Sequence, residues 1–239
     1  MTRRLAVDPH VHSAGSYDAT GTVEEILTGA SAAGLDALAV TDHDAIERSL
    51  RAVELAPSYG LLALPGVEVS TADGHLLALG VDRRPPAGEP LARTVERVRE
   101  RGGVAVVPHP FERLRHGAPA AAIDDCDGVE TYNACSLLSV RRRAARRFAA
   151  ERGHARIGGS DAHTPAMVGR AYTEVLVETA AATPDEVSAD AVLDAIRRGA
   201  TRVRGRRTPV RRFVRKYATN ARLKTGALFA RRGVTLTRR

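Results

Sequence analysis

Four short clusters of histidine and aspartate, each directly after a short apolar run, constrain the fold of this chain more than any other feature. The clusters are Asp8-Pro-His10-Val-His12, Thr41-Asp42-His43-Asp44, Pro108-His109-Pro110 and Gly159-Ser160-Asp161-Ala-His163. The chain has eight histidines, and five of them lie in these clusters. Short apolar runs bounded by turn residues indicate buried strands of a parallel sheet. The sequence therefore predicts a metal site assembled from the ends of several strands.

Between the clusters, predicted strands and predicted helices alternate along the chain. We expect strands over residues 5–8, 35–41, 61–70, 75–81, 104–107, 128–132, 155–158 and 171–177, and helices over 22–33, 45–56, 91–101, 111–116, 137–152 and 190–198. Thr22 and Glu25 have the spacing of a helix capping box, and Asp73-Gly74 is typical of a hairpin turn. This alternation predicts an α/β fold with a parallel sheet, open or closed into a barrel.

The side chains in the clusters suit metal binding. In such folds ligands collect at the carboxyl ends of the strands, where the clusters and Glu68 are expected to lie. In a strand, His10 and His12 point to the same side. Taken alone, each cluster is also compatible with a helix cap, a turn or surface histidines. Their joint occurrence favours one site, and imidazole with carboxylate and no thiolate suits zinc, manganese or iron.

These motifs, together with Ser13, Asp18 and Gly66-Val-Glu68, resemble in order and spacing those of the PHP (polymerase and histidinol phosphatase) superfamily. The resemblance covers residues 5 to about 177 and favours the stand-alone phosphoesterase branch. It implies an α/β fold, a distorted seven-stranded (β/α) TIM-like barrel, with two or three divalent metal ions and hydrolysis of phosphoesters. We expect the barrel over residues 1–200 and a basic tail over 201–239.

The resemblance also implies a role for each cluster residue. The implied metal ligands are His10, His12, Asp18, His43, Glu68, His109, Asp161 and His163. A metal-bound water would be the nucleophile, with Glu68 and Asp161 bridging or orienting. Asp42 would either orient a ligand ring or cap a helix.

One departure from the family pattern concerns the expected fifth strand. Some members with three metals carry a further histidine there, whereas this chain has Val129-Glu-Thr-Tyr-Asn133. We expect water, substrate or Asn133 to complete the second metal site. Asn133, Arg143 and Arg170 are candidates for binding the substrate, the two arginines because a guanidinium offers phosphate a bidentate fork.

The charge of the chain is unevenly distributed. Residues 197–239 contain 16 of the 36 basic residues and no Asp or Glu, so the rest of the chain is acidic although the formal net charge is +8. Residues 211–232 mix apolar and basic side chains in a pattern open to a basic amphipathic helix. Such a tail could bind nucleic acid, lie on an anionic membrane surface, pack on the acidic body or stay partly disordered.

Two cysteines without a repeating spacing, no long apolar segment and no signal-peptide pattern predict a soluble cytoplasmic protein without a transmembrane segment. The leading hypothesis is a metal-dependent phosphoesterase acting on a phosphorylated small molecule, a nucleotide or an oligonucleotide. Two alternatives are an RNA- or DNA-directed nuclease that uses the tail, and a non-catalytic nucleic-acid- or membrane-binding protein on the same scaffold.

Overall fold

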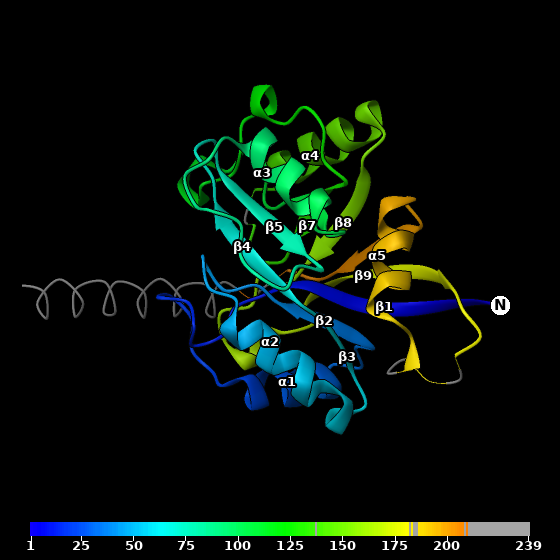
Figure 1. Ribbon diagram of the computed structural model, residues 1–239. Helices are drawn as coiled ribbons and strands as arrows, with labels where there is room; N and C mark the ends of the chain where they lie inside the picture. Colours follow the sequence, from blue (N-terminus) through cyan, green and yellow to red (C-terminus); the bar gives the residue numbers. More distant parts are fainter. Residues whose placement is uncertain (137, 182, 184–185, 208, 210–239) are drawn as a thin grey trace, which may run out of the picture.

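Strands and helices alternate along most of the chain in the computed structural model (Figure 1). It describes residues 1–239 except 137, 182, 184–185, 208 and 210–239. The strands are β1 (Thr2–Val11), β2 (Ala37–Val40), β3 (Leu62–Leu64), β4 (Gly66–Ser70), β5 (His75–Leu79), β6 (Val104–Val107), β7 (Gly128–Asn133), β8 (Ala155–Gly159), β9 (Ala171–Glu178) and β10 (Thr201–Gly205). The α-helices are α1 (Val23–Ala32), α2 (Glu47–Leu55), α3 (Leu91–Glu100), α4 (Ser139–Arg152) and α5 (Ala189–Arg197). The segment expected to be a helix over residues 111–116 contains only a 3-10 turn, Arg113–Arg115.

The strands form two mixed five-stranded sheets. The first sheet has the order β10-β9-β1-β2-β3, and the second has the order β4-β5-β6-β7-β8. In the first sheet β1 runs parallel to β2 and antiparallel to β9. In the second sheet β4 and β5 form an antiparallel hairpin, as Asp73-Gly74 predicted, and β6, β7 and β8 are parallel.

The expected seven-stranded barrel is wrong, because neither sheet closes on itself within the described residues. The predicted strand over residues 61–70 is interrupted at Pro65, which has no N–H to donate to a neighbouring strand. Its first half, β3, pairs with β2 in one sheet, and its second half, β4, pairs with β5 in the other. The sheets also approach each other through two single-residue bridges, Val11 with Ala162 and His43 with Glu68.

Helices cover the outer faces of the two sheets. Figure 1 shows α1 and α2 against the first sheet and α3 and α4 against the second. The expected capping box is present at α1, where Thr22 and Glu25 each accept from the other's backbone N–H. Between the sheets lies an apolar core to which Leu5, Val7 and Ile157 contribute. This core fixes the strand ends that carry the polar clusters.

Strand β10 continues the first sheet past residue 200 and pairs with β9. Residues 210–239, which include the predicted amphipathic helix over 211–232, lie outside the described residues. Within the part of the chain that is described, no helix has the length and apolar character needed to cross a bilayer.

Candidate metal centre

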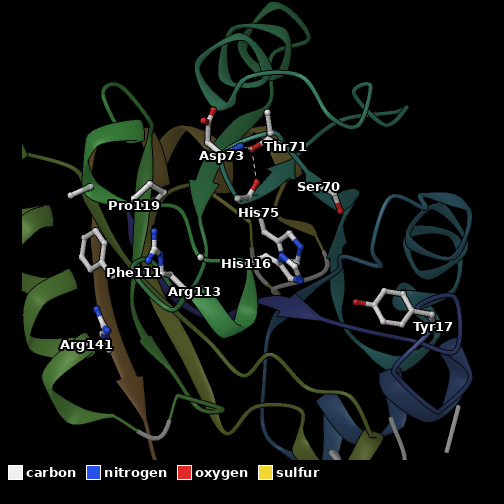
Figure 2. A pocket seen from close by; sticks show the side chains of 14 residues that line it. Tyr17, Ser70, Thr71, Asp73, His75, Phe111, Arg113, His116, Pro119 and Arg141 are labelled. Carbon is white, nitrogen blue, oxygen red and sulfur yellow. Dashed lines mark hydrogen bonds between the residues drawn. The ribbon is translucent and has the colours of Figure 1, made fainter. Parts of the chain in front are cut away.

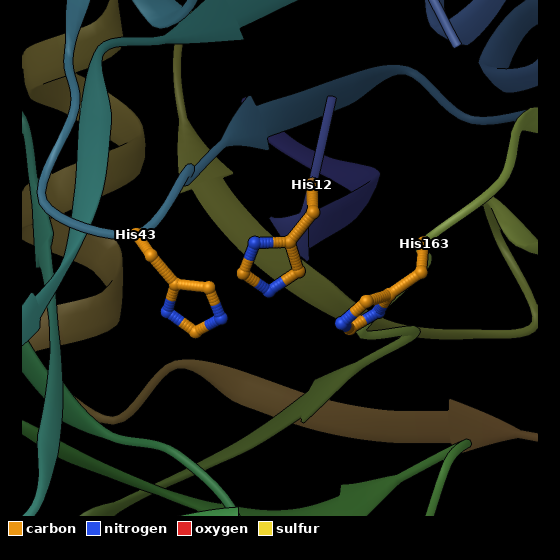
Figure 3. A group of neighbouring side chains, drawn as sticks. All are labelled: His12, His43 and His163. Carbon is orange, nitrogen blue, oxygen red and sulfur yellow. The ribbon is translucent and has the colours of Figure 1, made fainter. Parts of the chain in front are cut away.

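The structure brings all the predicted metal ligands together where the two sheets meet. Four groups of three side chains have ligand atoms within 4.8 Å of one another: His12, His43 and His163; His10, His12 and Glu68; His10, His109 and Asp161; and His43, Glu68 and His75. Figure 3 shows the first group, whose rings come from three separate segments and point toward one another. The predicted ligand absent from these groups, Asp18, lies 3.1 Å from Nε2 of His163 through its Oδ2.

Four buried atoms form the centre of this arrangement. Nε2 of His10 lies 3.1 Å from Nε2 of His12. Oε2 of Glu68 lies 3.4 Å and 3.2 Å from these two nitrogens. Oδ1 of Asp161 lies 3.7 Å and 3.5 Å from them. Two ring nitrogens and two carboxylate oxygens therefore surround one point.

Neighbouring groups determine which ring nitrogens carry protons. Nδ1 of His10 lies 3.2 Å from Oε1 of Glu130, and an ionised carboxylate only accepts, so this nitrogen donates. Ser16 Oγ donates to Asp42 at 2.9 Å, so Nδ1 of His12, at 3.1 Å, must donate to Ser16. In the neutral rings both Nε2 atoms then carry lone pairs.

Lone pairs facing each other at 3.1 Å, with two carboxylate oxygens beside them, repel unless a positive charge lies between them. The surroundings of Oε2 of Glu68 also indicate a place for a positive charge. This oxygen makes no hydrogen bond among the described residues, although three ring nitrogens lie within 3.4 Å. Imidazole nitrogen and carboxylate oxygen are ligands for zinc, manganese and iron. The residues present therefore fit a divalent cation.

Glu68 is shared between this point and a second group. Its Oε1 lies 3.1 Å from Nε2 of His109 and 2.9 Å from Nδ1 of His75. A third group is formed by His43, His163 and Asp18, in which Nδ1 of His163 donates to the carbonyl of Asp161 at 2.8 Å. Because Nδ1 carries the proton, Nε2 of a neutral His163 has a lone pair. This lone pair faces Oδ2 of Asp18, which as part of an ionised carboxylate can also only accept.

Burial and charge set the protonation of the cluster. Burial raises the pKa of Glu68, but the surrounding histidines outweigh it and hold the pKa well below 4.5. Burial lowers the pKa of His43 to about 4 and that of His109 to about 3. Burial also opposes the charge on His10, but the carboxylates of Glu68 and Glu130 raise its pKa to about 10. A cation at this position would replace the proton of His10.

The backbone is strained at several of these positions. His109, Asp161 and Asp44 have φ of 30°, 51° and 49°, values that residues other than glycine adopt at a cost. Asp44 accepts from the N–H of Ser70 at 2.9 Å, which ties the second cluster to the end of β4. Such strain is typical of functional sites, where the surrounding structure compensates for it.

Glu130, in the expected fifth strand, belongs to the cluster although the sequence motifs did not predict it. Its side chain is fully buried, and Oε2 accepts from the backbone N–H of His109 and from the amide of Asn133, both at 2.8 Å. The signal in the sequence is a carboxylate within the buried run Gly128–Asn133. His75, to which we gave no ligand role, also lies in the cluster.

The remaining predicted site residues lie at or outside the cluster. Asn133 is buried and donates to Glu130 and to Asp161, so its amide positions two carboxylates. Asp42 orients the ring of His12 through Ser16 rather than by direct contact. Arg143 is exposed on α4, and Arg170 donates to the carbonyl of Arg207 at 2.7 Å.

A groove of about 930 Å³ opens beside the cluster. At its lining, the ring of Tyr17 stacks on His43 with centroids 5.2 Å apart, and His116 stacks on His75 at the same separation. Figure 2 shows His75 and His116 between Tyr17 on one side and Phe111, Arg113 and Arg141 on the other. The groove therefore leads from the histidine and carboxylate cluster to two exposed arginines.

The fold and the cluster define an α/β protein whose side chains are arranged to bind metal ions. The PHP domain family matches residues 8–154, and the family described as PHP-associated matches residues 141–201. The chain belongs to the PHP family.

Known proteins are similar to different shares of the chain. The uncharacterised protein MJ1587 of Methanocaldococcus jannaschii is 30% identical over 54% of this chain and 82% of its own length. The 3',5'-nucleoside bisphosphate phosphatase of Chromobacterium violaceum is 37% identical, over 39% of this chain and 33% of its own length. The crystal structure of PsfC from Pseudomonas syringae has a TM-score of 0.68 at 22% identity and covers 93% of this chain and 99% of that chain. This last likeness concerns the fold alone.

Proposed function

We propose that this chain is a metal-dependent phosphoesterase that hydrolyses a phosphomonoester or a nucleotide or oligonucleotide phosphate. The observation that carries the proposal is the pair of Nε2 atoms of His10 and His12, which lie 3.1 Å apart and beside two buried carboxylates. The phosphatase of Chromobacterium violaceum supports the substrate class, since it is a relative named for a bisphosphorylated nucleoside.

We assign the cluster to two or three divalent ions, manganese, zinc or iron, through the following side chains. The first would be held by His10, His12, Glu68 and Asp161; the second by Glu68 and His109; and the third by Asp18, His43 and His163. Ions bound there would activate a water molecule for attack on phosphorus and neutralise charge on the phosphoryl oxygens.

The protein's own side chains give this site its shape. Glu130 and Ser16 hold the rings of His10 and His12 with Nε2 toward the centre. Glu68 lies between the first two groups and offers one oxygen to each. Asn133 donates to Oδ2 of Asp161 at 3.0 Å and so orients the carboxylate of Asp161. The ligands are thus held in place before substrate arrives.

The groove would hold the part of the substrate that carries the ester. A volume of about 930 Å³ is much larger than one phosphate group needs. Arg113 and Arg141 line it, and within the described residues neither has an ion pair. We assign them to a second anionic group of the substrate, because guanidinium groups bind phosphate bidentately. Arg143 and Arg170 are not among the lining residues.

The nuclease alternative differs only in the length of the substrate at the same site. Residues 210–239 of the basic tail that suggested it lie outside the described residues, so the alternative depends on charge in the sequence. A strand of nucleic acid would place its next phosphate further along the groove. Comparing cleavage of mononucleotides and oligonucleotides separates the two.

Hydrolysis of a chromogenic phosphate ester by the Mn²⁺-loaded protein tests the proposal. Replacing Asp161 by Asn keeps a residue that tolerates positive φ, so any loss reports the missing charge. We expect kcat/KM of this variant and of His12→Ala to fall by more than the roughly 10- to 100-fold that losing an outer partner of a ligand costs.

Asp124→Asn, at an exposed position outside the cluster, is the matched control and should keep the wild-type rate. Equal rates for Asp161→Asn and Asp124→Asn would refute the ligand assignment. An absence of turnover with esters, nucleotides and oligonucleotides in the presence of manganese, zinc and iron would refute the activity.

A further inference from the structure

A second hollow, of about 280 Å³, lies away from the metal cluster where β7, β8, β10 and α4 come together. Strand β7 contributes to both places. The side chain of Glu130 is in the metal cluster, whereas the next two residues, Thr131 and Tyr132, line the hollow. The pairing of β7 with β8 shifts register between Glu130 and Tyr132. At this irregularity the side chains of β7 change from the metal cluster to the hollow.

Three arginines from three different elements line this hollow. Arg146 comes from α4, Arg156 from β8 and Arg202 from β10, and all three are exposed. The side chains that line the hollow include no carboxylate, and within the described part of the chain none of the three arginines has an ion pair. By contrast, Arg204 on the same strand as Arg202 pairs with Glu174 at 3.1 Å.

Positive charges gathered around one hollow whose lining includes no carboxylate repel one another, and a bound anion would offset this repulsion. The wall beside them is formed by Tyr132, whose ring lies 4.7 Å from the guanidinium carbon of Arg142. A volume near 280 Å³ lies just under the roughly 300–1,000 Å³ of pockets for drug-sized ligands, so it suits a small group.

We propose that this hollow is an anion site, separate from the metal cluster, that binds a phosphate-bearing group with two or more negative charges. The planar guanidinium groups of Arg146, Arg156 and Arg202 supply paired N–H donors that match phosphate oxygens. The anion is either a free small molecule such as a polyphosphate or a phosphate of a nucleic-acid strand whose other part reaches the site elsewhere. The proposal does not depend on catalysis at the metal cluster.

The test is calorimetric titration of inorganic pyrophosphate into the full-length, metal-free protein. Arg146→Gln removes one guanidinium from the hollow. The control is Arg147→Gln, which removes the same charge from the next position of α4; Arg147 is exposed and does not line the hollow. We expect wild type and Arg147→Gln to bind equally, and Arg146→Gln to bind roughly tenfold more weakly, as for lost hydrogen bonds to a charged group. Equal weakening by both substitutions would overturn the proposal.

A single-stranded RNA hexamer distinguishes the two sources of phosphate. Binding of pyrophosphate that depends on Arg146 supports a free anion, and binding of the hexamer alone with the same dependence supports a strand. Binding of neither probe to the wild-type protein contradicts the site. Because these titrations contain no metal, their result is independent of whether the protein hydrolyses phosphoesters.

Discussion

At the scale of single residues, the arrangement around the ligands is as informative as the ligands themselves. His10 and His12 both donate through Nδ1, to Glu130 and to Ser16, and so direct Nε2 toward the same point. A carboxylate or hydroxyl behind a histidine fixes both its tautomer and its orientation. The sequence motifs revealed the rings, but the partners behind them come from positions up to 120 residues away.

Replacing Glu130 by Gln tests this arrangement. Oε2 of Glu130 accepts from the N–H of His109 and the amide of Asn133, while Oε1 faces Nδ1 of His10. The NH₂ of glutamine must face either those two donors or Nδ1 of His10. The second choice puts the proton of His10 on Nε2. We expect the affinity for Mn²⁺, measured by titration of the metal-free protein, to fall roughly 10- to 100-fold.

Glu151→Gln is the matched control for this experiment. Glu151 is exposed on α4, so the same change of charge there should leave Mn²⁺ affinity unaltered. If Glu130→Gln binds Mn²⁺ as tightly as Glu151→Gln, Glu130 does not orient a ligand.

Gly159 provides a second test of close packing behind a ligand. An added Cβ would lie 2.5 Å from Oε1 of Glu130 and 2.8 Å from Cβ of His10, both of which belong to the buried cluster. Gly159→Ala must therefore displace one of these side chains. We expect weaker Mn²⁺ binding and a lower thermal midpoint of the metal-free protein. Wild-type values for both quantities would show that the cluster can shift without cost.

At the scale of elements, local signals predicted helix ends well. Thr22 accepts from the N–H of Glu25 at 3.2 Å, and Glu25 accepts from the N–H of Thr22 at 2.9 Å. Thr22→Ala removes one of these bonds and should lower the free energy of unfolding by about 1 kcal/mol. Denaturation in urea measures this change.

Thr28→Ala, within the exposed face of the same helix, is the comparison. Thr28 only donates to the carbonyl of Glu24, and alanine has the higher helix propensity, so its free energy of unfolding should stay within about 0.5 kcal/mol of wild type. An equal loss in both variants would mean that the capping box contributes nothing specific.

The course of the chain between residues 61 and 70 shows where local reasoning failed. The run is apolar enough to predict one strand, but Pro65 divides it, and β3 and β4 then pair in different sheets. Proline was visible in the sequence as a break in a strand. The pairing of the two halves with different sheets could not be seen in the sequence. It depends on contacts with β2 and β5, which are separate segments of the chain.

At the scale of the whole molecule, the site is the place where two open sheets meet. His10, His12 and His43 belong to the first sheet or follow its strands, whereas Glu68, His109 and Asp161 belong to or follow strands of the second. The alternation of strands and helices predicted an α/β fold and ligands at strand ends. It could not predict whether the sheet closes, since closure depends on pairings between strands far apart in sequence.

Because the proposed ligands come from both sheets, a bound cation should act as a link between them. At a free metal concentration 100 times the Kd, binding to the folded state alone stabilises by about 2.7 kcal/mol. For a chain of this length, that corresponds to a rise of roughly 5–10 °C in the thermal midpoint. Scanning calorimetry of the chelator-treated protein with and without added Mn²⁺ measures the rise. His12→Ala should show a much smaller rise, because it removes an atom from the centre of the cluster. An equal rise in His12→Ala would place the stabilising ion elsewhere.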